Sequence, residues 1–435
     1  MTDEVLEVCD ASAGYARQMD RPAVPEGYRD TEIGIIPEDW EVSAARQKGE
    51  ILAGKALAIN APGEQRPYLR TKNVLDGRID ITDVLKMPMT DEQFRQFQVR
   101  NGDVLLNEGQ SLELVGRCSI YNDEYPEPCA IQNALLRFRA RSGVCENFAS
   151  HLFRHCQQTG VFSRISLQTT SVAHLGSTRF GRLRLAWPTE AEQRAIATAL
   201  SDVDSLLGSL DRLIAKKRDI KQAAMQQLLT GETRLPGFEG ACETKTLEEI
   251  ADIRSGGTPS TTNQDLWNGG VAWCTPTDIT ALHGRKHLTE TERTISQKGL
   301  QASSAEVIPP NSIIMTTRAT IGECAINTIP MTTNQGFKNL IPLNADSEFL
   351  FYLMTTQKQL LLQLCGGSTF LEVGKKQLQT FKVTLPSDIE EQAAIATVLS
   401  DMDAELEALE QRRSKTAELK QGMMQELLTG RTRLV

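Results

Sequence analysis

The stretch EQRAIATALSDVDSLL, residues 192–207, recurs as EQAAIATVLSDMDAEL, residues 391–406, with 11 of 16 positions identical. The stretch KQAAMQQLLTGETRL, residues 221–235, recurs as KQGMMQELLTGRTRL, residues 420–434, with 11 of 15 positions identical. Both matches share one offset of 199 residues, and no insertion or deletion is needed between them. A repeat that keeps its length while its sequence drifts indicates a duplicated rigid element.

Each copy of the repeat predicts one long helix, because apolar residues recur in steps of three and four as in a coiled-coil seam. Thr189-x-x-Glu192 and Ser387-x-x-Glu390 are predicted capping boxes, and Gly231 and Gly430 stand where helix-ending glycines belong. The predicted seam residues are Ile196, Leu200, Val203, Leu206, Leu210, Leu213 and Ile220 in the first copy and Ile395, Leu399, Met402, Leu406, Leu409, Leu419 and Met423 in the second.

A helix of about 40 residues is about 60 Å long. One narrow seam is unstable alone, so we expect the two copies to pair antiparallel and to bury each other's apolar residues. A helical hairpin with no role beyond folding is the plainer alternative. The constant length favours a spacer that sets the distance between two domains.

The helices divide the chain into repeated parts. We expect an acidic tail at 1–26, a first domain at 27–188, a central spacer helix at 189–231, a second domain at 232–387 and a C-terminal spacer helix at 388–435. Strand-like runs at 102–107, 339–343 and 381–385 and amphipathic segments near 147–157 and 348–364 predict α/β (α+β) domains. The predicted fold is thus a tandem repeat with pseudo-two-fold symmetry.

Polar and glycine-rich loops recur at similar positions in both domains. In the first domain they include Tyr68–Asn73 and Asn107–Ser111, and in the second they are Arg254–Thr262, Trp273–Asp278, Thr316–Gly322 and Thr333–Lys338. Arg and Lys can bond guanine, Asn and Gln can bond adenine, and Ser, Thr and glycine amides can hold phosphate. Such loops are more often plain turns, and only their recurrence favours DNA contact. The candidate DNA-binding residues are Arg70, Lys72, Asn73, Asn107, Gln110, Ser111, Arg117, Gln132, Asn133, Thr170, Ser171 and His174 in the first domain and Arg254, Thr258, Ser260, Thr275, Thr277, Asp278, Thr317, Arg318, Thr320, Asn334, Gln335, Lys338, Ser368 and Thr369 in the second.

Charge alone does not suggest DNA, because the net charge is −9. The acidity is concentrated at 1–35 and at 388–430, so both domains are close to neutral. The nine cysteines include no CxxC pair, and the N-terminus has no signal pattern. We therefore expect reduced thiols, no membrane segment and a cytoplasmic protein.

The sequence carries no motif of a catalytic site. An NPPF- or DPPY-like methyltransferase motif, a GxxxxGK[ST] phosphate loop, a GxSxG elbow and an HExxH helix are all absent. A nuclease using Glu108 and Glu113 and a scaffold without any DNA role remain as alternatives. His151 with His155 and Cys156, and His283 with His287, have helical spacing, but we expect packing or surface histidines and no metal site.

Several of these motifs resemble one family. The stretch Gly27–Trp40 resembles the start of type I restriction–modification specificity (S) subunits. The GGTPS loop followed by Trp267 and Trp273 resembles the opening of their target-recognition domains, and both helical motifs resemble their spacer regions. The resemblance covers nearly the whole chain.

The resemblance implies a DNA-reading subunit with no catalytic site and no cofactor of its own. Each domain would read one half of a split, asymmetric site on double-stranded DNA, and the helices would set the gap. Two modification (M) subunits would supply S-adenosylmethionine and adenine methylation. Restriction (R) subunits would add cleavage driven by ATP and Mg. The role of residues 1–26 stays open.

Overall fold

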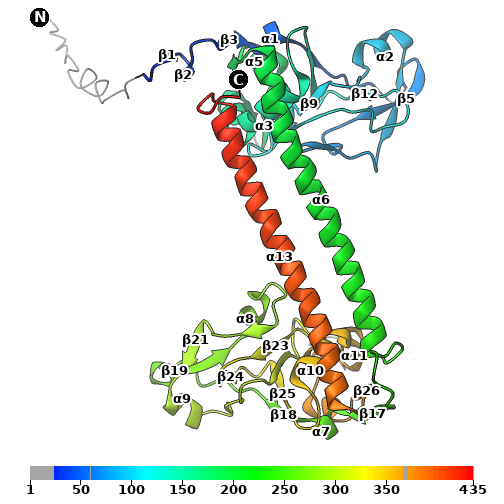
Figure 1. The fold of residues 1–435 in the computed structure, drawn as a ribbon, viewed down its shortest axis with the longest axis vertical. Coiled ribbons are helices and arrows are strands. Elements are labelled where there is room, and N and C mark those ends of the chain that lie inside the picture. The colour runs from blue at the N-terminus through cyan, green and yellow to red at the C-terminus, as the bar shows by residue number, and fades with distance from the viewer. Residues whose placement is uncertain (1–23, 59, 170, 366–370, 435) are drawn as a thin grey trace, which may run out of the picture. The chain divides into compact units, whose positions relative to one another are not determined.

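The computed structural model describes residues 24–58, 60–169, 171–365 and 371–434. The chain divides into two compact units, Met1–Leu210 with Arg412–Val435 and Asp211–Gln411. Each unit contains strands, short helices and one stretch of each long helix (Figure 1). Most of the predicted tail, and the candidates Thr170, Ser368 and Thr369, lie outside the described residues.

A four-stranded antiparallel sheet forms the main layer of the first unit. Its order is β11-β9-β13-β4, with β4 at Gly49–Ala53, β9 at Val104–Asn107, β11 at Cys118–Ile120 and β13 at Leu135–Ala140. Helix α3, Glu146–Gln158, packs on this sheet through Phe153, whose ring lies 4.9 Å from that of Phe138 and 5.0 Å from that of Phe180. Edge-to-face aromatic pairs of this kind make a dense core.

A smaller sheet forms the second layer of this unit and has its own apolar core, which includes Leu69, Met89 and Ile131. Its order is β12-β5-β8, with β5 at Glu64–Leu69, β8 at Leu85–Met89 and β12 at Ala130–Ile131. The unit also contains β1 Tyr28–Thr31, β2 Gly34–Pro37, β3 Glu41–Ala44, α1 Ala45–Lys48, β6 Val74–Leu75, β7 Arg78–Ile79, α2 Asp91–Phe97, β10 Gly109–Gln110, α4 Val161–Ile165, β14 Leu167–Thr169, β15 Val172–His174, α5 Ser177–Arg182 and β16 Arg184–Trp187.

The second unit repeats this topology. The main sheet, β18-β25-β22-β23-β20, matches the order of the first and adds one edge strand, and the small sheet is β21-β19-β24. These strands are β18 Ala251–Ser255, β19 Trp267–Cys274, β20 His287–Leu288, β21 Arg293–Ile295, β22 Ile313–Thr316, β23 Cys324–Asn327, β24 Thr332–Thr333 and β25 Phe337–Pro342. The other elements are β17 Cys242–Thr246, α7 Leu247–Ile250, η2 Gln264–Leu266, α8 Pro276–Thr280, α9 Gln297–Gln301, α10 Ser347–Thr356, α11 Lys358–Leu364, α12 Lys375–Gln379 and β26 Lys382–Pro386. The predicted α/β tandem repeat is confirmed.

Two long helices run through both units, α6 at Glu190–Leu229 and α13 at Ile389–Leu427. In the first unit the start of α6 shares a core with the end of α13, through Ile196, Leu200 and Leu427. In the second unit the end of α6 shares a core with the start of α13, through Leu228 and Leu399. The predicted antiparallel pairing is therefore confirmed within each unit.

Two details of the helix prediction are wrong. Four predicted seam residues do not lie in a buried seam: Leu206, Leu213 and Ile220 are 40–42% exposed and Leu419 is 60% exposed, whereas Leu210 is buried. The cap of α13 is Asp388, whose carboxylate accepts the amide N–H of Glu390, while Ser387 donates its hydroxyl to the Ala241 carbonyl.

The duplicated motifs meet each other at both ends of the helix pair. Glu192, at the start of α6, accepts hydrogen bonds from Arg433 Nε at 2.7 Å, Arg433 Nη2 at 2.9 Å and Trp40 Nε1 at 3.0 Å. The repeat partners Arg234 and Glu391 form the same ion pair at the other end. Each junction thus joins the first motif of one helix to the second motif of the other, which explains why both motifs are duplicated together.

A second pair of ion pairs, Asp204–Lys420 and Lys221–Asp403, which we call the latch pairs, links the helices farther in. Lys420 Nζ lies 2.6 Å from Asp204, and the other latch pair joins the repeat equivalents of these residues. Both therefore fix the same antiparallel register. An ion pair that is half buried contributes little net stability, and its clearest use is to specify pairing.

Candidate nucleic-acid interface

Four predicted loops of the second unit converge at one edge of its small sheet. Strands β19 and β24 are parallel, with Cys274 opposite Thr333, so the loops that follow them leave at the same edge. The GGTPS loop joins them, because the amide of Gly257 donates to the carbonyl of Thr333 at 2.9 Å. The Thr316–Gly322 loop joins too, through Thr317 N–H and the Gly336 carbonyl at 2.8 Å.

Glycines make this convergence possible. A Cβ added at Gly256 would lie 1.9 Å from the Asn334 carbonyl oxygen, and one at Gly257 would lie 2.3 Å from the Ala305 nitrogen. In the first unit, a Cβ at Gly54 would lie 2.1 Å from the Gln132 carbonyl oxygen. The two units therefore use the same close backbone approach beside equivalent loops.

The first unit gathers its candidate loops in the same way. Strands β5 and β12 are parallel, with Leu69 opposite Ile131, so Arg70 and Gln132 leave at one edge. The amide of Glu108 donates to the Ala134 carbonyl at 2.9 Å, which brings the loop after β9 to that edge. The sheet β10-β15-β14 then adds the strands that contain Gln110 and His174.

The two tryptophans of the second unit hold its glycine-rich loop. Trp273 Nε1 donates to the Gly257 carbonyl at 2.9 Å, and Trp267 Nε1 donates to the Ser260 carbonyl at 3.0 Å. The Arg293 guanidinium lies over both rings, at 4.1 Å from the centroid of Trp267 and 5.0 Å from that of Trp273. The Trp-rich segment therefore fixes the loop's shape.

Some candidate side chains are occupied in building the loops. Asn73 is buried and donates to the carbonyls of Asp80 and Asp83, and Asn107 is buried and donates to that of Val74. In the second unit, buried Asp278 caps α8 by accepting from Thr275. Buried polar groups that are bonded in this way hold the loops in shape.

Several further candidates are bonded within the chain. Arg117 donates to the Val74 and Thr71 carbonyls. Arg254 pairs with Asp252 and Glu306. Thr317 is buried, and its hydroxyl donates to the Gly336 carbonyl. Burial lowers the pKa of Lys338. The buried hydroxyl of Thr320 has no partner among the described residues. These side chains help to shape the edge.

The remaining described candidates have side chains that are exposed or half-buried at the two edges, which agrees with a role in direct contact. Lys72 and Arg70 share Asp83 at 2.6 Å. Thr258 bonds Gln335, and Ser260 bonds Thr262. The set is Arg70, Lys72, Gln110, Ser111, Gln132, Asn133, Ser171, His174, Thr258, Ser260, Thr277, Arg318, Asn334 and Gln335.

Sequence reasoning missed the acidic partners at these edges. Glu108 Oε2 lies 3.1 Å from His174 Nδ1, and Glu372 Oε2 lies 2.9 Å from Arg318 Nη2. The sequence suggests a role for the Glu108 carboxylate only in the alternative nuclease site. No local pattern signals these pairs, because their members are far apart in the sequence.

The histidines at helical spacing have other partners. His151 is buried, its Nε2 lies 3.1 Å from Ser201 Oγ, and burial lowers its pKa to about 4. His287 Nε2 lies 3.1 Å from Glu348. In the described part of the chain, no three His, Cys, Asp or Glu residues are grouped so that they could hold a metal ion.

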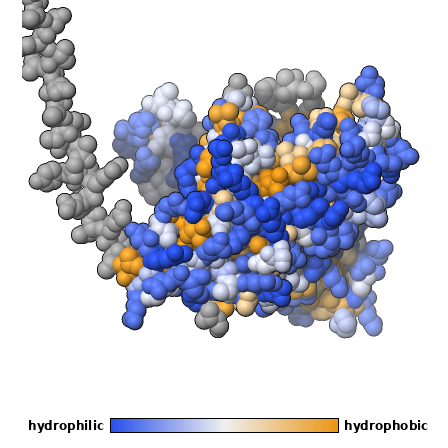
Figure 2. Space-filling view, turned by 90° about the horizontal axis from the view of Figure 1, so that it is seen from above, coloured by the Kyte–Doolittle hydropathy of each residue, from blue (hydrophilic) through white to orange (hydrophobic). Residues whose placement is uncertain are grey.

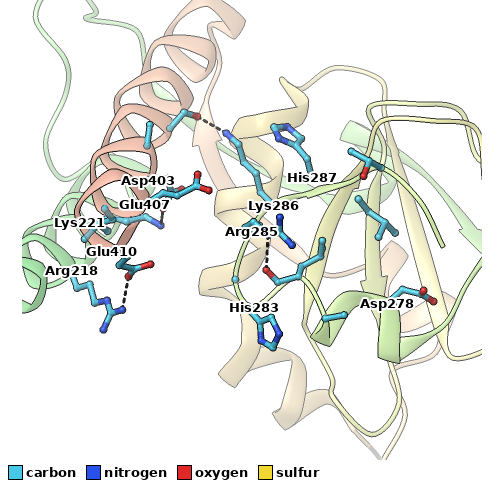
Figure 3. Close-up of a pocket in the computed structure, with 18 of the residues that line it drawn as sticks. Arg218, Lys221, Asp278, His283, Arg285, Lys286, His287, Asp403, Glu407 and Glu410 are labelled. Carbon is cyan, nitrogen blue, oxygen red and sulfur yellow. Dashed lines mark hydrogen bonds and ion pairs between the residues drawn. The ribbon is translucent and has the colours of Figure 1, made fainter. Parts of the chain in front are cut away.

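A cavity of about 1270 Å³ lies within the second unit, between the long helices and the loop at 281–292. Figure 3 shows Arg218 and Lys221 facing Glu410 and Asp403, with which they pair. Lys286, on the opposite wall, bonds Glu348 and Ser400. Much of the charge in this cavity is compensated within the chain, which argues against phosphate binding there.

None of the helices in the described residues is both long and apolar enough to cross a membrane. On the face in Figure 2, hydrophilic residues predominate and apolar residues lie in scattered groups.

Comparisons with known proteins identify the fold and the motifs. The family described as "Type I restriction modification DNA specificity domain" matches residues 240–420. The putative type I restriction enzyme MjaX specificity subunit of Methanocaldococcus jannaschii is 25% identical, over 94% of this chain and 97% of that protein. The MjaIX specificity subunit of the same organism is 39% identical, over 37% of this chain and 38% of that protein.

A solved structure agrees. The crystal structure of the type I restriction–modification S subunit from M. genitalium aligns with a TM-score of 0.54 at 15% identity, over 89% of this chain and 96% of that one. The full-length match, the matched family domain and the shared fold lead to one conclusion. Residues 240–420 belong to the type I restriction modification DNA specificity domain family, and the chain is similar over nearly its whole length to a type I restriction enzyme specificity subunit.

Proposed function

We propose that this chain is the non-catalytic DNA-recognition subunit of a type I restriction–modification complex. Its domains at 27–188 and 232–387 each read one half of a bipartite, asymmetric DNA site. One observation carries the proposal: both units gather polar loops at the same edge of the same topology, but with different side chains. To read two different half-sites, the two units need loops at equivalent positions that carry different side chains.

The chain's charge implies that it does not bind DNA strongly alone. Its net charge is −9, and the phosphate contacts that dominate DNA affinity require a surplus of Lys and Arg. Tight binding therefore depends on partner subunits that surround the duplex, while this chain supplies base contacts. Such a complex works where the DNA is, in the cytoplasm.

The long helices offer the docking surface for those partners. Leu206, Leu213 and Ile220, seven residues apart, lie 40–42% exposed along α6, and Leu419 of α13 is 60% exposed. Repeated exposed apolar residues on paired helices favour docking of further helices. We assign this surface to two M subunits, which bring S-adenosylmethionine and adenine methylation, and the helices at 189–231 and 388–435 to the spacer. The R subunits, with ATP and Mg, add cleavage.

The docking surface gives a specific expectation. The double variant Leu213→Glu, Ile220→Glu should bind M subunits at least tenfold more weakly, because two apolar contacts become buried carboxylates. Leu343→Glu is the matched control, since Leu343 is 60% exposed but lies outside the helices. Titration of M subunits against each variant checks this, and equal affinity for all three proteins would contradict the assignment.

The function itself is tested in the host. Deleting the gene should remove one split adenine-methylation motif from the methylome, and exchanging residues 36–188 for the matching segment of another family member should change one half of that motif. A gel shift with purified M and S subunits on the motif gives the same test in vitro. An unchanged methylome, or a swap that alters both halves, would refute the proposal.

A further inference from the structure

At the edge of the second unit, two backbone segments that are far apart in the sequence, Thr317–Arg318 and Glu372–Val373, pair with each other. We call such a paired site a station. Arg318 forms an antiparallel bridge with Glu372 directly after β22. The carbonyl of Thr317 accepts the amide of Val373 at 3.1 Å, and the amide of Thr317 donates to the Gly336 carbonyl at 2.8 Å.

The first unit has the equivalent station. Gly109 pairs with His174 directly after β9. The carbonyl of Glu108 accepts the amide of Leu175 at 2.9 Å, and the amide of Glu108 donates to the Ala134 carbonyl at 2.9 Å. The same three backbone interactions therefore recur in both copies of the tandem repeat.

Each station holds one pair of an acid and a base. In the first unit the Glu108 side chain is half-buried, at 19% exposed, and its partner His174 is 42% exposed. In the second unit the Arg318 side chain is 47% exposed, and Glu372 holds one of its terminal nitrogens at 2.9 Å. Lys338 Nζ also lies 4.0 Å from Glu372, so the station has a surplus of positive charge. Among the described residues of the first unit, Glu108 is paired with His174 alone, so the carboxylate dominates.

We infer that these stations read bases: Arg318, oriented by Glu372, reads a guanine in one half-site, and Glu108, oriented by His174, reads a cytosine in the other. This inference rests on the proposed function and assigns the chemistry of its two sites. Guanine presents O6 and N7 acceptors in the major groove, which match the arginine fork, and cytosine presents an N4 donor, which matches a carboxylate. Glu372 is a positioning residue, because it restricts the long Arg318 side chain while leaving other N–H groups exposed.

The experiment uses the full chain assembled with M subunits and duplexes that contain the methylated motif. Arg318→Lys keeps the charge but loses the fork, so affinity should fall about tenfold. A duplex with 7-deazaguanine at the assigned position lacks the N7 acceptor and should weaken the wild-type complex several-fold but leave the Arg318→Lys complex unchanged. Glu372→Gln should lower discrimination at the same position less than Arg318→Lys does.

The control lies in the other half of the chain. Glu108→Gln should relax the preference at one cytosine of the opposite half-site and leave the guanine preference intact. In each variant, the preference that stays intact shows that the domain without the substitution is still folded. The inference is overturned if Arg318→Lys keeps full discrimination throughout, if it alters both half-sites, or if the affected half-site contains no guanine. Absence of any motif for the wild-type complex would instead refute the proposed function.

Discussion

Replacing Glu192 with alanine is expected to remove about 3–5 kcal/mol from the unfolding free energy of the first unit, because it breaks a buried ion pair from one side. The Glu192 side chain is only 1% exposed, and it accepts bonds from Arg433 and from the buried indole of Trp40. Its hydrogen bonds raise the pKa of Arg433. Without Glu192, the indole N–H of Trp40 and the Nε–H of Arg433 lose their acceptor, while Asp39 still accepts from the two terminal nitrogens of Arg433.

Asp39→Ala is the matched control, since Asp39 bonds the same guanidinium at 2.7 and 2.9 Å but is 50% exposed. An exposed pair of this kind contributes about 1 kcal/mol or less. Hydrogen exchange measured peptide by peptide suits a protein of two units, for which one global unfolding transition is not defined. Equal effects of the two variants would contradict this account of the junction.

The repeat, the helices and the tandem topology could be predicted from the sequence because their signals are local. A periodic apolar pattern and the glycines at 231 and 430, both with φ +74°, define the helices without knowledge of the rest. The exposure of Leu206, Leu213 and Ile220 could not be predicted in this way. The same apolar periodicity is expected of a seam that one partner helix buries and of an exposed surface on which further helices can dock.

The candidate interface could be predicted by residue type but not by role. Asn73 and Asn107 look like base-reading residues, but both are buried. Asn73 lies in the turn before β6 and donates to the Asp80 carbonyl, and Asn107 at the end of β9 donates to the Val74 carbonyl. Glu372 lies 54 residues from Arg318, and Glu108 lies 66 residues from His174, so no motif joins them. Long-range pairing decides which polar side chain faces solvent and which partner orients it.

Deleting residues 207–213 from α6 together with 411–417 from α13 is expected to shorten the gap of the methylated motif without changing its bases. Seven helical residues span about 10 Å, which is about three base pairs of duplex at 3.4 Å each. The two segments are matched in the helix register, because the first begins three residues after Asp204 and the second ends three residues before Lys420, its latch partner. Removing a whole heptad also keeps the apolar face in phase.

Deleting residues 207–213 alone separates spacer length from helix register. The latch pairs Asp204–Lys420 and Lys221–Asp403, and the junction of Glu192 with Arg433, then cannot all form, because one helix is about 10 Å too short for its partner. Methylation should be lost at every spacing, whereas the paired deletion should methylate the shorter-gap motif. Methylome sequencing of cells that express each variant distinguishes the two results. An unchanged gap after the paired deletion would show that the helices are not the spacer, because the half-site separation must follow the length of the element that sets it.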